Sequence, residues 1–167
     1  DLSVTQFAVA GLSAAQNLIP EASEDFPDFI TFMINSQIGN GGYSYRVSGR
    51  GNGRSHSTMS ATGLWCLRLT QVPMEDDSTQ GALQWLRANY RYDDVVGSNA
   101  QFTYYYIWAA AKGLKVSDAY LTPDLLTGYD FGDRNPAESG YPEENLSHYF
   151  DFAYTLLSWQ DLATGRW

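Results

Sequence analysis

The chain has 167 residues, which is enough for one domain with a substantial core. Its 44% hydrophobic and 15% aromatic content excludes a disordered chain, and its formal net charge of −9 argues against a nucleic-acid partner that requires neutralised phosphates. The sequence contains no run of eighteen apolar residues and therefore predicts no membrane span, and its single cysteine, Cys66, leaves the compartment unknown.

Apolar residues recur at helical spacing along most of the chain, and this pattern predicts an all-α fold. Acidic or hydroxyl residues, prolines and glycines mark where the helices begin and end. We expect helical segments over residues 1–18, 25–38, 57–69, 75–90, 99–112, 122–126 and 146–162. Gly113 is expected to end the fifth segment, and residues 128–145 are expected to form a long surface loop.

The connection from Gly39 to His56 contains six glycines and three arginines. It is not a phosphate-binding P-loop, because no Gly-Lys-Ser/Thr follows the glycines. Two interpretations stay open. The connection is either a solvated link between two helices or an anion-attracting lid over a cleft.

The first and third helical segments resemble each other. Gly11-Leu12 and Gly63-Leu64 are 52 residues apart, and looser echoes follow near residues 105 and 152. A period of this length with two helices in each repeat predicts stacked helical hairpins. We expect residues 1–167 to form a single domain of this kind, with the odd-numbered, small-residue-rich helices on the inner side.

Two stretches resemble the prenyltransferase and squalene-cyclase repeat family. Met33-x3-Gln37-x3-Gly41-Gly42-Tyr43 is similar to that family's Gln-to-Gly-x-aromatic signature, and the stretch Ser57-Thr-Met-Ser-Ala-Thr-Gly-Leu is similar to the opening of an inner helix. The resemblance implies an α/α toroid. The length allows about three and a half hairpins, which predicts a partial or divergent toroid, or a fragment of a larger one. Such a toroid exposes apolar inner-helix surface, so self-association or a missing neighbouring domain is also predicted.

The catalytic groups that the resemblance implies are largely missing. Cyclases of this family carry an Asp-x-Asp-Asp motif at the start of an inner helix, and only Asp1 remains at the matching position. The cluster at 75–77 is acidic, but we expect it to cap a helix. Zinc needs three or four ligands, and Cys66 with His56 and His148 does not supply a recognisable set, so neither a metal nor a cofactor is predicted.

Three functional hypotheses remain. The first is a non-catalytic helical-repeat module whose concave aromatic face binds an apolar or aromatic-compatible ligand or a protein partner. The second is a terpenoid-cyclase-like or prenyltransferase-like enzyme, or a fragment of one, as the resemblance alone implies. The third is a carbohydrate-active α/α toroid, because aromatic and acidic clefts also suit sugars.

The candidate acid/base pair is His148 with Asp151, which lie at helical spacing, although a helix-terminal histidine and a surface carboxylate would show the same spacing. The residues expected to line the concave face are Tyr43, Tyr45, Arg46, Thr58, Tyr104, Tyr105, His148, Asp151 and Tyr154.

Overall fold

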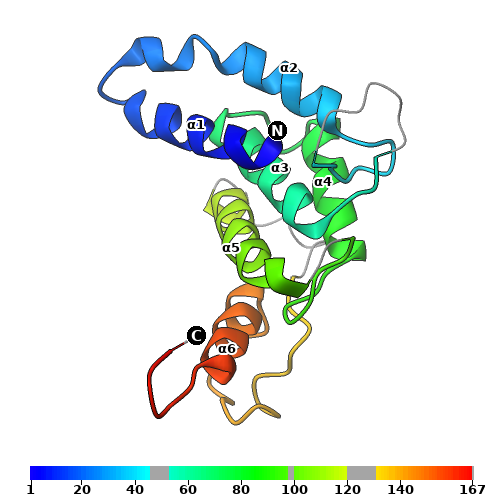
Figure 1. Ribbon diagram of the computed structural model, residues 1–167, viewed down its shortest axis with the longest axis vertical. Coiled ribbons are helices and arrows are strands. Elements are labelled where there is room, and N and C mark those ends of the chain that lie inside the picture. Colours follow the sequence, from blue (N-terminus) through cyan, green and yellow to red (C-terminus); the bar gives the residue numbers. More distant parts are fainter. Residues whose placement is uncertain (46–52, 98–99, 120–130, 167) are drawn as a thin grey trace.

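The structure is a computed structural model that describes residues 1–45, 53–97, 100–119 and 131–166. Every regular element in these ranges is helical, and the only strand-like pairing is an isolated bridge between Gln37 and Tyr43. The helices are α1 (Leu2–Ala15), α2 (Phe26–Ser36), α3 (Ser57–Leu69), α4 (Asp77–Ala88), α5 (Thr103–Ala119) and α6 (His148–Trp159), with short 3₁₀ helices at Pro20–Ser23 and Ala100–Phe102 (Figure 1). The prediction of an all-α fold is confirmed.

Polar side chains fix the starts of three helices. Asp1 accepts a hydrogen bond from the backbone N–H of Val4 at 3.2 Å and caps α1. Asp76 caps α4 through the N–H of Ser78 at 2.9 Å, which confirms the capping role predicted for the acidic cluster. Ser147 caps α6 in the same way. Each cap satisfies an N–H that has no partner within its helix.

Helix α3 lies at the centre of the molecule (Figure 1). It is buried along nearly its whole length, and it packs most extensively against α5, then against α1 and α4. Small side chains on α3 allow these neighbours to approach closely. The odd-numbered helices α1, α3 and α5 are therefore adjacent in space, although they are far apart in sequence.

Helix α5 continues past Gly113 to Ala119, so the prediction that Gly113 ends it is wrong. A Cβ atom at Gly113 would lie 3.2 Å from the carbonyl oxygen of Ala61 and 3.3 Å from the backbone nitrogen of Trp65. The glycine is therefore inside the helix because α5 crosses the α3 backbone at this point. The predicted helix over 122–126 lies outside the described residues. The described part of the expected surface loop, from residue 131 to α6, contains turns and no helix.

The glutamine and glycine motif joins three helices. Gln37 follows α2 and donates through Nε2 to the carbonyl oxygens of Gly41, at 2.9 Å, and Ser78, at 2.8 Å. Gly41 has a φ of +87°, and a Cβ there would lie 2.3 Å from the carbonyl oxygen of Gly81 in α4. Tyr43 is fully buried with its ring against Gly63 of α3. The motif thus fixes the end of α2 against α4 and α3.

No helix in the described part of the chain is both long enough and apolar enough to cross a lipid bilayer.

Candidate functional site

A groove of about 920 Å³ runs between α5 and α6. Each helix contributes one stripe at spacings of three and four residues, so the two walls are continuous helix faces. Trp65 of α3 completes the lining. The α5 stripe consists of Tyr104, Ile107, Trp108, Ala111, Lys112, Lys115 and Val116, and the α6 stripe consists of His148, Tyr149, Phe152, Ala153 and Leu156.

Aromatic rings hold the α5 side of the groove in place. The ring of Trp108 meets Trp65 edge-on, with ring centroids 5.2 Å apart. It stacks on Tyr105 at 5.9 Å and contacts Phe7 of α1 at 5.7 Å. The ammonium group of Lys112 lies over both tryptophans, 5.5 Å from the Trp65 centroid and 5.3 Å from the Trp108 centroid. The helices α1, α3 and α5 therefore contribute to one aromatic surface that carries a positive charge.

Two of the predicted site residues line this groove. Tyr104 is 45% exposed, and its ring meets Trp159 of α6 at 5.4 Å. His148 is the first residue of α6, and its ring lies 6.1 Å from that of Phe152. An exposed phenol and an imidazole can both donate hydrogen bonds to a bound molecule.

Three other predicted residues line a second, smaller cavity of about 470 Å³ at the start of α3. These are Tyr45, Thr58 and Tyr105, together with Ser3, His56, Met59 and Phe102. The hydroxyl of Tyr45 donates to Asp1 Oδ2 at 3.0 Å, and Gln6 of α1 donates to the hydroxyl of Tyr105. Burial raises the pKa of Tyr105. Asp1 is exposed beside this cavity, where its carboxylate caps α1.

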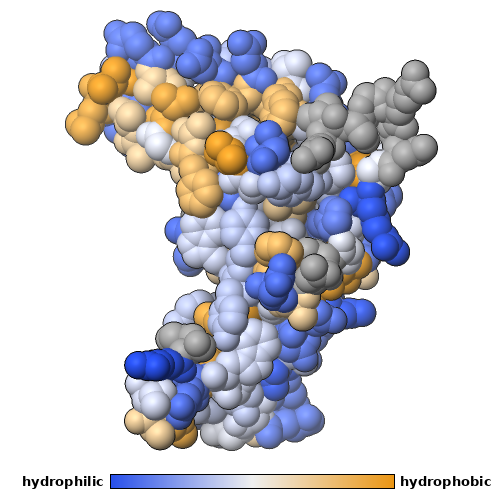
Figure 2. Space-filling model, in the orientation of Figure 1, coloured by the Kyte–Doolittle hydropathy of each residue, from blue (hydrophilic) through white to orange (hydrophobic). Residues whose placement is uncertain are grey.

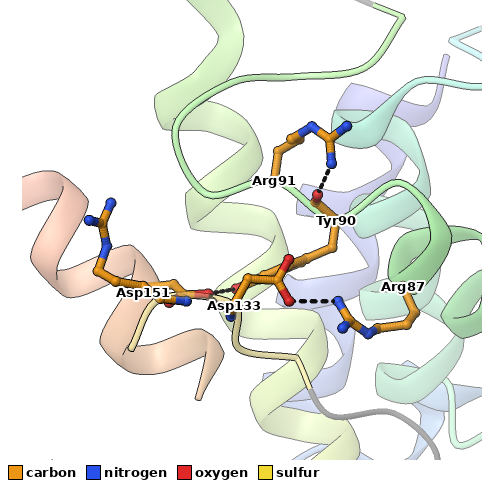
Figure 3. Close-up of polar contacts among 6 residues, drawn as sticks. Arg87, Tyr90, Arg91, Asp133 and Asp151 are labelled. Carbon is orange, nitrogen blue, oxygen red and sulfur yellow. Dashed lines mark hydrogen bonds and ion pairs between the residues drawn. The ribbon is translucent and has the colours of Figure 1, made fainter. Parts of the chain in front are cut away.

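Asp151 is fully buried and accepts three hydrogen bonds, two of them from a neighbouring loop (Figure 3). The hydroxyl of Tyr90 donates to its Oδ2 at 2.9 Å, and the backbone N–H groups of Asp133 and Arg134 donate at 2.8 and 2.9 Å. Burial and the nearby Asp151 carboxylate raise the pKa of Tyr90. Asp151 thus joins α6 to the loop before it and to the segment that follows α4. It is not among the residues that line the groove.

Further polar contacts surround this carboxylate. Arg87 of α4 forms an ion pair with Asp133 at 3.1 Å, and Arg91 donates to the carbonyl oxygen of Tyr90 at 2.7 Å (Figure 3). The guanidinium of Arg134 lies over the ring of Tyr154, 4.4 Å from its centroid. Tyr154 lines a third cavity, of about 510 Å³, at the end of the molecule formed by α6.

The remaining predicted residues lie elsewhere. Tyr43 belongs to the core, its hydroxyl has no hydrogen-bond partner among the described residues, and burial raises its pKa. Arg46 lies outside the described residues. The eight predicted residues that the structure describes are therefore distributed over three cavities, a buried polar network and the core, and they do not form a single site.

No three His, Cys, Asp or Glu side chains within the described ranges are grouped as a metal site requires. Cys66 is fully buried on α3, and burial raises the pKa of its thiol to about 12. A thiol in this environment stays protonated at neutral pH and is a poor metal ligand.

Four residues that line the groove were not predicted to belong to a site, namely Trp65, Trp108, Lys112 and Lys115. A usable signal was present, because Lys112 and Lys115 continue the stripe that starts at Tyr104. Comparisons of the chain with protein-family models, with curated proteins and with solved structures found no match.

Proposed function

We propose that this chain is a helical-repeat module that holds a small apolar molecule in the groove between α5 and α6 without transforming it. The groove is the observation that supports the proposal. Its volume of about 920 Å³ is that of a small-molecule site, for which roughly 300–1,000 Å³ is usual, and its walls are mostly aromatic and aliphatic. Its rings are held by packing on three helices, so the surface is formed before a ligand arrives.

The positions of the carboxylates favour binding over catalysis. A proton donor of the cyclase type must be kept dry and protonated, whereas Asp1 is exposed and accepts hydrogen bonds as a helix cap. Asp151 is buried, but three donors already occupy its oxygens and it does not line the groove. Neither group has the environment of a general acid that faces the groove.

We also propose that the hairpins form a partial and divergent array of the prenyltransferase and squalene-cyclase type. The adjacency of α1, α3 and α5 and the joining role of Gln37 support this proposal. Hydrophobic residues gather over α1 and the turn that follows it (Figure 2). Val4, Phe7 and Leu18 there are 67%, 58% and 87% exposed. An apolar face of this kind supports self-association or contact with a neighbouring domain.

A groove-filling substitution tests the proposed binding site. Ala111 lies on the α5 wall, and Ala111→Phe should occupy the groove without removing any of its packing contacts. Ala88→Phe is the matched control, because Ala88 is exposed at the end of α4 and outside the groove. The assay is tryptophan fluorescence, since Trp65 and Trp108 line the groove, with a panel of alkyl and phenylalkyl alcohols and acids.

We expect at least one compound of the panel to bind the native chain and Ala88→Phe equally. Binding to Ala111→Phe should be at least about tenfold weaker, which corresponds to a loss of roughly 1.4 kcal/mol. If no compound binds the native chain, or if Ala111→Phe binds as tightly as the control, the groove is not the binding site.

A further inference from the structure

The charge around the groove is opposite to that of the chain as a whole. The protein carries a formal net charge of −9, yet none of the described residues that line the groove is acidic. The chain has only two lysines, Lys112 and Lys115, and both line the groove together with one of its two histidines, His148. A random distribution of a few basic residues over an acidic surface would not be expected to place both lysines here.

The two lysines are also arranged to act together. They are three residues apart on the α5 stripe, so both extend from one helix face. The ammonium of Lys112 is held over the rings of Trp65 and Trp108, which places a positive charge directly at the aromatic wall. Neither lysine forms an ion pair with a carboxylate of the described residues. Within the described part of the chain, both charges are thus without an acidic partner.

We infer that the ligand of this groove is an amphipathic anion, with an apolar body and one terminal acidic group. The inference rests on the proposed binding function and adds the class of ligand. The apolar body packs on Trp108, Ile107 and the α6 stripe, and the acidic group faces the ammonium groups of Lys112 and Lys115. Both lysines are exposed, so their attraction for an anion is that of surface charges and depends on the salt concentration.

Three probes with the same apolar body separate charge from burial. They are 6-phenylhexanoate, 6-phenylhexan-1-ol and 6-phenylhexylamine, titrated into the native chain at pH 7 and low salt. We expect the acid to bind about tenfold more tightly than the alcohol, and the amine most weakly. Added salt should weaken binding of the acid and leave binding of the alcohol nearly unchanged.

Variants identify the source of the preference. Lys112→Gln with Lys115→Gln should abolish the advantage of the acid over the alcohol, whereas Lys112→Arg with Lys115→Arg should keep it. Arg54→Gln removes one positive charge from an exposed position outside the groove and serves as the control. A fall in thermal stability of the Gln double variant is monitored separately by circular dichroism.

Chemical acetylation gives a second readout that does not depend on the variants. The chain has three amines that acetylation can modify, namely those of Lys112, Lys115 and the amino terminus. The acid should protect both lysines from acetylation and leave the amino terminus reactive, as measured by mass spectrometry.

The outcomes separate the two proposals. If none of the three probes binds, the proposed binding function fails. If the alcohol binds as tightly as the acid, or if the acid keeps its advantage in the Gln double variant, the groove binds ligands without selecting anions and this inference is overturned.

Discussion

Replacing Asp151 by asparagine tests whether this buried carboxylate serves the fold. The native side chain accepts from the Tyr90 hydroxyl and the Asp133 N–H on Oδ2, and from the Arg134 N–H on Oδ1. An asparagine carbonyl placed at the Oδ2 position keeps two of these bonds. Its amide group then faces the N–H of Arg134, so two donors meet inside the protein, and Oδ1 is the acceptor that is lost.

The magnitude follows from these contacts. A hydrogen bond to a charged group contributes about 1.5–3 kcal/mol, and a buried donor without a partner costs about 1–3 kcal/mol. We therefore expect Asp151→Asn to lower the free energy of unfolding by about 3 kcal/mol, or the melting temperature by roughly 6–12 °C for a chain of this size. Urea denaturation followed by circular dichroism measures the first quantity, and a thermal scan measures the second.

Asp133→Asn is the matched control, because it removes one negative charge from the same loop. Its carboxylate pairs with Arg87 at a partly exposed site, where the side chains are 37% and 42% exposed, so the loss should stay below about 1 kcal/mol. Equal effects of the two substitutions, or an Asp151→Asn variant as stable as the native protein, would refute the structural role. In that case Asp151 would again be a candidate acid or base.

Three further predictions concern packing, pH and association. In urea titrations, Gly11→Ala should raise the free energy of unfolding by about 0.5–1 kcal/mol, because nothing lies within 4 Å of the added Cβ. Gly113→Ala should lower it by about 1 kcal/mol, because the added Cβ meets the backbone of α3. The reverse order would contradict the packing described for α5. Burial raises the pKa of three phenols, those of Tyr43, Tyr90 and Tyr106. In an alkaline titration followed by circular dichroism, the free energy of unfolding should be constant below the unfolded tyrosine pKa near 10 and should fall above it, by about 1.4 kcal/mol per pH unit for each of these phenols. A chain equally stable at pH 8 and pH 11 would disprove this. Sedimentation velocity should show concentration-dependent association that Leu18→Glu weakens, and a compact monomer at high concentration would argue against self-association.

Local sequence signals were sufficient to predict most of the helices. Helix α3 covers Ser57–Leu69, the same range that its small and apolar residues predict. The acidic cap of α4 could also be predicted from the sequence, because a cap depends on residues within one helical turn of each other. These features come from short-range backbone hydrogen bonding and the spacing of apolar residues, both of which the sequence contains.

The C-terminal end of α5 could not be predicted from local sequence. A glycine after a helical stretch usually marks the C-terminus, and Gly113 followed that rule in sequence. In the structure it lies against Ala61 and Trp65 of α3, so close packing of two helices decides the conformation there. No local pattern distinguishes a glycine that ends a helix from one that admits a neighbouring backbone.

In the candidate site, too, the sequence predicts the kind of residue and the packing of helices decides where each side chain lies. The sequence predicted an aromatic inner face, whereas the aromatic residues from Tyr104 to Tyr106 point in different directions. Tyr104 faces the groove, Tyr105 the smaller cavity, and Tyr106 the core. Their roles depend on which neighbouring helix each side chain meets.

By itself, the sequence of this protein determined an all-helical chain, the positions of most of its helices and an apolar, aromatic interior. Only the tertiary structure decided that α5 and α6 enclose a groove, that both lysines of the chain line it, and that Asp151 is buried under a loop. The physical reason is that helix formation depends on neighbours in sequence, whereas a site depends on the packing of faces from helices that are distant in sequence.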